Sequence, residues 1–113
     1  MMINATSVVI NKKFNLAFIG GGLNSAIGTT HKIASQMDGR FKLVSGCFSR
    51  DSKTNRLTAE AWGVAADRVY DDWQYLMANE KNKVDAIVIL TPTPYHFNIV
   101  INAIEQGYPV ICE

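Results

Sequence analysis

The sequence predicts a doubly wound α/β fold with one parallel sheet of five strands in the order 3-2-1-4-5. Short apolar runs alternate with stretches whose apolar residues recur at helical spacing, a pattern that requires parallel strands joined by right-handed crossovers. Four glycines fall in residues 20–28, between the first apolar run and the first helical stretch, where such folds bind ligands. The chain has 113 residues, 48% of them hydrophobic and 19% charged, which suits one domain with its own core.

The first half of the chain predicts two strands and two helices. The run FNLAFIG (14–20) is apolar and ends in glycine, as expected of a strand buried on both faces. A helix over 25–37 follows, and FKLVSGCFS (41–49) is the second strand. Asp51 can cap a second helix that ends near Gly63. The apolar residues expected to face the sheet from these two helices are Ile33, Ala34, Met37, Leu57, Ala61 and Val64.

The second half predicts three more strands. RVY (68–70) is a short third strand, and Asp72 caps a brief helix after it. VDAIVIL (84–90) is the most strand-like run, and Thr93 then caps a helix that Pro94 begins. PVIC (109–112) is the fifth strand, which completes a doubly wound sheet of the Rossmann type. The apolar residues expected to face the sheet from these helices are Trp73, Leu76, Met77, Phe97, Val100, Ile101 and Ile104.

Composition excludes several classes of partner. The formal net charge is +1 and no basic stripe occurs, which argues against nucleic acid. No apolar run approaches the roughly 20 residues that span a bilayer. We expect residues 1–12 to form an N-terminal arm that need not be ordered, and residues 13–113 to form the domain. In the predicted order, Cys47 and Cys112 lie three strand spacings apart, about 14 Å, so they are expected to be buried, unpaired residues in a reducing cytoplasm.

The glycine-rich turn predicts a site for a diphosphate. Unpaired N–H groups and the positive dipole end at a helix start suit a phosphate, and a Cβ would obstruct its approach. Gly20 is expected to allow the tight turn, Gly22 to leave room for the diphosphate, and Gly28 to let the helix pack closely on the first strand. The predicted cofactor contacts in this turn are Gly20, Gly21, Gly22, Leu23, Asn24, Ser25, Ile27 and Gly28.

The spacing departs from the usual GxGxxG pattern of dinucleotide sites, because Ser25 stands where the third glycine is expected. Either the loop is three residues longer, which places that glycine at Gly28, or Ser25 replaces it as a small residue. A glycine-rich turn that holds no ligand is the alternative interpretation.

The end of the second strand bears on which dinucleotide binds. An acidic residue there would accept the ribose hydroxyls of NAD and repel the 2′-phosphate of NADP. The sequence instead has Ser49 and Arg50, with Asp51 just beyond. A hydroxyl and a guanidinium can both bind a phosphate, so NAD(P) is the predicted cofactor with a preference for NADP, and NAD stays open.

Three motifs carry a resemblance to a known family. FIGGG with SAIGTTH, LTPTPYHF and the terminal GYPVICE resemble the N-terminal half of the glucose–fructose oxidoreductase, inositol dehydrogenase and rhizopine-catabolism family (Gfo/Idh/MocA). Thr91, Pro92 and His96 match its TPxxxH motif, and Glu113 matches the glutamate of its EKP motif. The resemblance implies a dinucleotide-binding domain, a second substrate domain, and hydride transfer between nicotinamide and a sugar or polyol. It implies that these four residues contact the cofactor.

The resemblance also implies what this chain lacks. The sequence ends at Glu113, one residue before the lysine of EKP, so we expect a truncated member that binds a dinucleotide without turnover and has no catalytic residue. The apolar edge of the last strand is expected to drive self-association. Neither His31 nor His96 has companions at metal-ligand spacing, so no metal is predicted. A methyltransferase that uses S-adenosylmethionine and a non-catalytic dinucleotide sensor remain alternatives.

Overall fold

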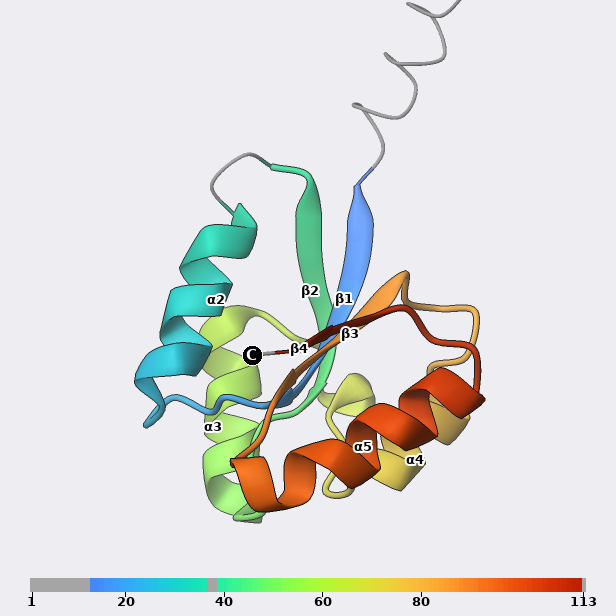
Figure 1. Cartoon of the computed structure of the whole chain (residues 1–113). Coiled ribbons are helices and arrows are strands. Elements are labelled where there is room, and N and C mark those ends of the chain that lie inside the picture. The colour runs from blue at the N-terminus through green and yellow to red at the C-terminus, as the bar shows by residue number, and fades with distance from the viewer. Residues whose placement is uncertain (1–12, 37–38, 113) are drawn as a thin grey trace, which may run out of the picture.

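A four-stranded parallel sheet forms the centre of the molecule in a computed structural model that describes residues 13–36 and 39–112. The strand order is β2-β1-β3-β4, so the chain begins in a central strand and ends at one edge (Figure 1). The register pairs Ile19 with both Cys47 and Ile89, which brings the carboxyl ends of three strands to one edge of the sheet. The strands are β1 (Phe14–Gly20), β2 (Phe41–Cys47), β3 (Ala86–Leu90) and β4 (Val110–Cys112).

Helices cover both faces of the sheet. In Figure 1, α2 and α3 lie on one side and α4 and α5 on the other. This is the distribution that a doubly wound sheet requires, so the predicted α/β class with a parallel sheet is confirmed. The helices are α2 (Ala26–Gln36), α3 (Ser52–Trp62), α4 (Trp73–Asn79) and α5 (Thr93–Glu105), with a single 3₁₀ turn, η1 (Ala66–Arg68), between α3 and α4.

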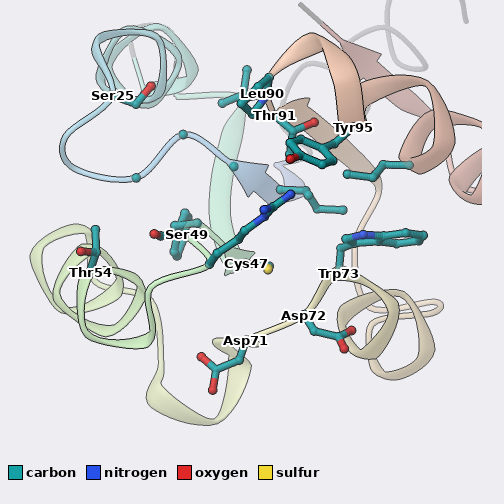
Figure 2. A pocket seen from close by; sticks show the side chains of 18 of the residues that line it. Ser25, Cys47, Ser49, Thr54, Asp71, Asp72, Trp73, Leu90, Thr91 and Tyr95 are labelled. Carbon is teal, nitrogen blue, oxygen red and sulfur yellow. The ribbon is translucent and has the colours of Figure 1, made fainter.

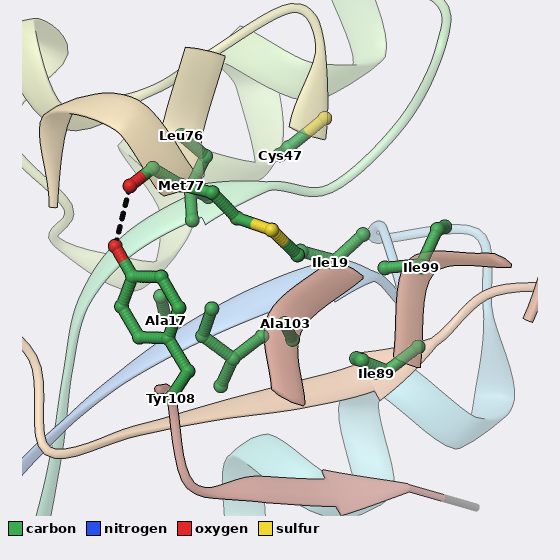
Figure 3. Packing of buried hydrophobic residues seen from close by; sticks show 10 residues of the cluster. Ala17, Ile19, Cys47, Leu76, Met77, Ile89, Ile99, Ala103 and Tyr108 are labelled. Atoms are coloured by element: carbon green, nitrogen blue, oxygen red, sulfur yellow. Dashed lines mark hydrogen bonds between the residues drawn. The ribbon is translucent and has the colours of Figure 1, made fainter. Parts of the chain in front are cut away.

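Two hydrophobic clusters, one on each face, hold these layers together. On the face covered by α4 and α5, Ile19 and Ile89 pack with Met77, and the Tyr108 hydroxyl donates to the Met77 carbonyl at 2.5 Å (Figure 3). On the other face, the rings of Phe48 and Trp62 meet edge to face with centroids 5.5 Å apart. Because β1 and β3 contribute to both clusters, they are buried on both sides, as their continuous apolar runs predict.

The helix ends follow local capping chemistry. The Asp51 carboxylate accepts a hydrogen bond from the Thr54 amide at 3.0 Å, and the Asp72 carboxylate accepts one from the Tyr75 amide at 2.9 Å. Gly63 closes α3 with φ of 73°. These three predictions are confirmed. The predicted cap at Thr93 is wrong, because Pro92 takes the capping position of α5 and makes no side-chain hydrogen bond there.

The prediction of five strands in the order 3-2-1-4-5 is wrong. The expected third strand, residues 68–70, forms only one isolated bridge, between Gly46 and Val69. The Tyr70 amide donates to the Gly46 carbonyl at 2.9 Å. The carbonyls of Arg68 and Tyr70, however, accept hydrogen bonds from side chains. The Ser45 hydroxyl donates to the Arg68 carbonyl at 3.0 Å, and the segment enters directly from η1, so no ladder can extend.

A buried carboxylate anchors this segment instead. Glu80 is fully buried at the end of α4, where it forms an ion pair with Arg68 and accepts a 2.7 Å hydrogen bond from the Tyr70 hydroxyl. Burial alone would raise the pKa of the Glu80 carboxyl, but the hydrogen bonds from Arg68 and Tyr70 outweigh it and hold this pKa below its ordinary value. Burial and the adjacent carboxylate raise the pKa of Tyr70 to about 12.

For three helices, most of the residues predicted to face the sheet are exposed instead, so these predictions are largely wrong. Ile33 of α2, Leu57 of α3 and Phe97 of α5 are exposed, Phe97 by 75%. In α5 the sheet instead buries Ile99 and Ala103, one turn apart, and leaves Phe97, Ile101 and Ile104 on the outer side. Apolar residues occupy two stripes of this helix, and periodicity alone cannot tell which stripe meets the sheet.

Two further expectations concern the ends of the sheet. Cys47 and Cys112 belong to β2 and β4, the two outer strands, so their predicted separation and unpaired state are confirmed. Cys112 is exposed, however, so the prediction that both are buried is wrong.

The expected arm, residues 1–12, lies outside the described residues. Within the described ranges, no helix combines the length and apolar character needed to cross a membrane.

Candidate functional site

A cleft of about 960 Å³ opens at the carboxyl ends of β1, β2 and β3 (Figure 2). The glycine turn after β1 forms one wall, and the first turns of α4 and α5 form the opposite one. This is the edge where doubly wound sheets bind ligands. Nine of the residues predicted to contact a cofactor line it: Gly20, Gly21, Gly22, Asn24, Ser25, Ser49, Arg50, Thr91 and Pro92.

Close contacts between main-chain atoms explain two of the glycines. Gly20 has φ of 86°, and a Cβ there would lie 2.9 Å from the Leu90 carbonyl carbon, so a side chain would separate the ends of β1 and β3. A Cβ on Gly28 would lie 1.8 Å from the Gly21 carbonyl oxygen. The first turn of α2 therefore packs directly on the main chain that leaves β1.

Hydrogen bonds fix the same turn to both neighbouring helices. The Ser25 hydroxyl accepts from the Gly28 amide at 3.2 Å, as a helix cap does, and the Ser25 amide donates to the Gly22 carbonyl at 2.8 Å. The Leu23 amide donates to the Thr58 hydroxyl of α3 at 3.0 Å. The turn is therefore a fixed wall of the cleft.

The other predicted contacts lie elsewhere. Leu23 and Ile27 are each 39% exposed and do not line the cleft, and Gly28 is buried behind the turn. The His96 ring lies outside the cleft and its Nδ1 donates to the Thr91 carbonyl at 3.3 Å, which places the proton on Nδ1 and braces the turn after β3. Glu113 lies outside the described residues.

Asn55 sets the position of the loop after β2, a role that the sequence analysis missed. This side chain is fully buried in α3, where its Oδ1 accepts from the Phe48 amide at 2.7 Å and its Nδ2 donates to the Tyr70 carbonyl at 2.7 Å. It thereby ties Ser49 and Arg50 to the segment that follows the single bridge. The burial of Asn55 becomes visible only in the structure, so the sequence alone carries no signal for this role.

Charged groups at this end of the cleft differ in how they are paired. Asp71 pairs with Arg56 at 3.4 Å, and Asp72 is engaged as the cap of α4. The Arg50 guanidinium lies over the Tyr95 ring, 4.0 Å from its centroid.

Burial first, and then the charges of Asp72 and Asp71, raise the pKa of the Cys47 thiol to about 11, so this cleft residue is a poor nucleophile. Across the described ranges, no group of three His, Cys, Asp or Glu could hold a metal ion.

An unsatisfied hydroxyl points to a ligand. Oγ1 of Thr91, a cleft residue, is buried and has no hydrogen-bond partner in the part of the chain that the structure describes. A buried polar atom left in this state costs about 1–3 kcal/mol, so a group that supplies the partner is stabilised there. The glycine wall, this hydroxyl and the Arg50 guanidinium together fit a dinucleotide, which offers phosphate oxygens, ribose hydroxyls and flat bases.

Several cleft residues were not predicted, because tertiary packing brings them there; Trp73, Tyr95 and Asn98 are examples. Trp73 is partly buried and packs against the core cluster, as predicted, and it also lines the cleft, as Tyr95 does (Figure 2). Trp62 is partly buried as well and packs against the cluster on the other face. Trp73 is an aromatic residue that follows a helix cap, and this local pattern is the same whether the side chain packs in the core or lines a cleft.

Comparisons with known proteins agree with this geometry. A family profile described as an oxidoreductase family with an NAD-binding Rossmann fold (GFO_IDH_MocA) matches residues 14–113. The uncharacterized oxidoreductase YfiI of Bacillus subtilis (strain 168) is 34% identical over 117 residues, which cover 100% of this chain and 30% of that protein. Inositol 2-dehydrogenase 4 of Saccharopolyspora erythraea is 31% identical over 103 residues, which cover 91% of this chain and 28% of that protein.

A solved structure shows the same fold. The crystal structure of an inositol dehydrogenase homolog from Azotobacter vinelandii, complexed with NADH and myo-inositol, superimposes with a TM-score of 0.86 at 34% identity, covering 92% of this chain and 28% of that one. The chain thus spans about 30% of the length of the curated relatives it matches. The methyltransferase alternative finds no support among these matches. The chain belongs to the Gfo/Idh/MocA oxidoreductase family and carries that family's NAD-binding Rossmann fold.

Proposed function

We propose that residues 13–113 form one dinucleotide-binding domain, and that the cleft holds NAD(P) with its diphosphate against the start of α2. The observation that carries this proposal is the glycine wall, where Gly28 packs on the Gly21 carbonyl and the chain that leads into α2 lines the cleft, through Gly20, Gly21, Gly22, Asn24 and Ser25. Amides at a helix start bind phosphate oxygens without any side chain. The cofactor itself supplies the hydride chemistry.

Apart from Ser49 and Arg50, the predicted residues divide into two groups along the dinucleotide. Main-chain groups of the turn hold the diphosphate, and the residues after β3 and β4 hold the nicotinamide half. Support for the second group comes from the unpartnered Thr91 hydroxyl and from the His96 bond that braces the Thr91 carbonyl. In the first group, Gly20, Gly21, Gly22, Asn24 and Ser25 line the cleft, and Leu23, Ile27 and Gly28 support the turn from outside it. The second group is Thr91, Pro92, His96 and Glu113.

For the whole protein we propose hydride transfer between nicotinamide and a carbon of a sugar or polyol. The supporting observation is the similarity to known proteins. One relative is named an inositol 2-dehydrogenase, and one structural match is complexed with NADH and myo-inositol. A cyclic polyol is therefore the first substrate to test.

We also propose a preference for NADP over NAD. Ser49 and Arg50 occupy the end of β2, where NAD-specific folds place an acid. Asp71 and Asp72 line the same cleft, but Asp71 already pairs with Arg56 and Asp72 caps α4. Arg50 thus remains the charged group that a 2′-phosphate would meet. Calorimetric titration with NAD and NADP, repeated on Arg50→Ala, tests this: the preference should disappear in the variant.

A matched pair of threonine variants tests dinucleotide binding. Thr91→Val keeps the shape of the side chain and removes the unpartnered hydroxyl. We expect equal or higher stability without ligand, and an NAD(P) dissociation constant about 2–10 times higher, since a net hydrogen bond contributes about 0.5–1.5 kcal/mol. Thr29→Val, on the exposed side of α2, is the control. Absence of calorimetric heat with either NAD or NADP in the unmodified chain would refute the proposal.

Two other expectations stay predictions. Self-association through the outer edge of β4 can be tested by sedimentation at several concentrations. A cytoplasmic location can be tested by fractionation of cells that express the protein.

A further inference from the structure

One amide of the glycine turn is bound by the protein itself. The Leu23 amide donates a hydrogen bond to the Thr58 hydroxyl of α3 at 3.0 Å. Within the turn, residues 20–25, Leu23 is the residue that does not line the cleft. Its two neighbours, Gly22 and Asn24, both line it. The main chain is therefore anchored to α3 at Leu23, between two residues that face the cleft.

The Thr58 hydroxyl is held in the orientation that this bond requires. Thr58 is fully buried, and its hydroxyl donates its single hydrogen to the Thr54 carbonyl, one turn earlier in α3, at 2.7 Å. The lone pairs of the hydroxyl are left to accept a hydrogen bond, and the Leu23 amide is a donor only. Thr58 does not line the cleft, so it can act on a ligand only through the turn.

Gly22 lets the turn come close enough to α3 for this bond to form. A Cβ at Gly22 would lie 3.2 Å from the Phe48 carbonyl oxygen and 3.5 Å from the Thr58 hydroxyl oxygen. The first distance is tighter than ordinary van der Waals contact, so a side chain would push the turn away from the end of β2 and from α3. The glycine at this position therefore has a packing reason in addition to the room it leaves for a ligand.

The amides on either side of Leu23 are left without a partner. Within residues 13–36 and 39–112, no hydrogen bond engages the Gly22 amide or the Asn24 amide. Main-chain N–H groups that lie close together in a turn, without partners, form a concave site for an anionic oxygen. Because Thr58 occupies the amide between them, these two amides are donors that the turn can present to a phosphate.

We propose that Thr58 is a positioning residue for the diphosphate: by binding the Leu23 amide, it holds the turn so that the amides of Gly22 and Asn24 meet phosphate oxygens. This inference rests on the proposed binding of NAD(P). Donors that are already held in place bind a ligand more tightly, because no further ordering has to accompany binding. Without the hydroxyl the Leu23 amide loses its partner, and a rotation of the turn that finds a new one would displace the two neighbouring amides.

Two substitutions of Thr58 separate the hydroxyl from the methyl group. Thr58→Val keeps the shape of the side chain and removes the hydroxyl, whereas Thr58→Ser keeps the hydroxyl and removes the methyl group. If Thr58 acted through packing alone, Thr58→Ser would weaken NAD(P) binding more than Thr58→Val, and positioning reverses this order. Thr30→Val is the matched control, because the Thr30 hydroxyl also donates to the carbonyl four residues earlier, at 2.9 Å, but is exposed on α2.

Calorimetric titration with NAD and NADP measures the effect, after circular dichroism has shown that each variant is folded. We expect Thr58→Val to raise the dissociation constant about 5–10 times and Thr58→Ser to raise it less than about threefold. Thr30→Val should bind like the unmodified chain. Equal affinity of Thr58→Val and the unmodified chain, or equal weakening by both substitutions of Thr58, would overturn the inference.

Amide hydrogen exchange measured by NMR gives a second readout that needs no ligand. The Leu23 amide should be protected from exchange in the unmodified chain and in Thr58→Ser, and should exchange at least about ten times faster in Thr58→Val. Addition of NAD should then protect the amides of Gly22 and Asn24. Unprotected exchange of the Leu23 amide in the unmodified chain would overturn the positioning role. Failure of the unmodified chain to bind NAD or NADP, with the Leu23 amide still protected, would instead overturn the proposed function.

Discussion

Replacement of Gly28 by alanine tests whether contact between main-chain atoms shapes the cleft. The new Cβ would lie 1.8 Å from the Gly21 oxygen and 2.4 Å from the Gly21 carbonyl carbon, so the turn has to retreat by about 1.5 Å to reach a tolerable contact. Overpacking of this kind costs about 1–3 kcal/mol, and the severity of the clash places it near the upper value. Alanine returns about 1 kcal/mol through its helix propensity. The net destabilisation is about 2 kcal/mol.

Thermal unfolding followed by circular dichroism measures this effect. For a domain of this size, about 2 kcal/mol lowers Tm by about 8 °C. The displaced turn should also raise the NAD dissociation constant at least about tenfold, because an error of about 1 Å in a binding wall is costly. Thr29→Ala, one residue further along α2 and exposed, is the control and should stay within about 0.5 kcal/mol of the unmodified chain. A Gly28→Ala chain with unchanged Tm and unchanged NAD affinity would show that the turn is not held by this contact.

Three further predictions concern buried polar groups and the cysteines. Glu80→Gln should destabilise the fold by about 1–3 kcal/mol by leaving Arg68 without its carboxylate. The folded pKa of Glu80 is depressed, so its ionised form stabilises above the unfolded value, and urea titrations should show the difference between variant and parent shrinking as pH falls from about 5 to about 3. Asn55→Ala leaves two main-chain groups unpaired and should cost about 2–4 kcal/mol in the same assay. Iodoacetamide at about pH 8 should modify the exposed Cys112 and leave the buried Cys47 unmodified until the chain unfolds, because burial raises the pKa of Cys47 to about 11. Mass spectrometry of the peptides measures the modification of each cysteine. Labelling of Cys47 before unfolding would contradict the packing.

Local chemistry made parts of the fold predictable. Asp51, Gly63 and Asp72 cap or close their helices through bonds to residues at most four positions away, so nearby sequence specifies them. The bounds of β1 are likewise predicted, because a run buried on both faces has no polar interruption. The order of strands and helices is also visible in the sequence, and the glycine wall and the residues after β2 and β3 could therefore be placed at the cleft before the structure was known.

Competition between distant groups made other parts unpredictable. RVY has the composition of a strand, but Ser45 and Asn55 take the carbonyls of Arg68 and Tyr70. Nothing in the three letters shows that these acceptors are used. The faces of α5 fail for a related reason: Ile99 and Phe97 are equally apolar, and only the position of the sheet decides between them. Propensity yields to tertiary packing in both cases.

The cleft residues that escaped prediction share this origin. Trp73 and Tyr95 belong to different helices and line one cleft because α4 and α5 begin at the same end of the sheet. The Arg50–Tyr95 contact joins residues that are 45 positions apart in sequence. A motif reports what lies beside a residue in the chain, and these contacts are made across the sheet.

The Gly21–Gly28 contact has a consequence for how freely this protein can be redesigned. Since atoms common to every amino acid set the distance between β1 and α2, the anchor does not depend on what the rest of that helix displays to solvent. Ala26, Thr29 and Thr30 all face outward beside it. An engineer could therefore rewrite the outward surface of α2, for tethering or solubility, while the seat for the diphosphate keeps its shape.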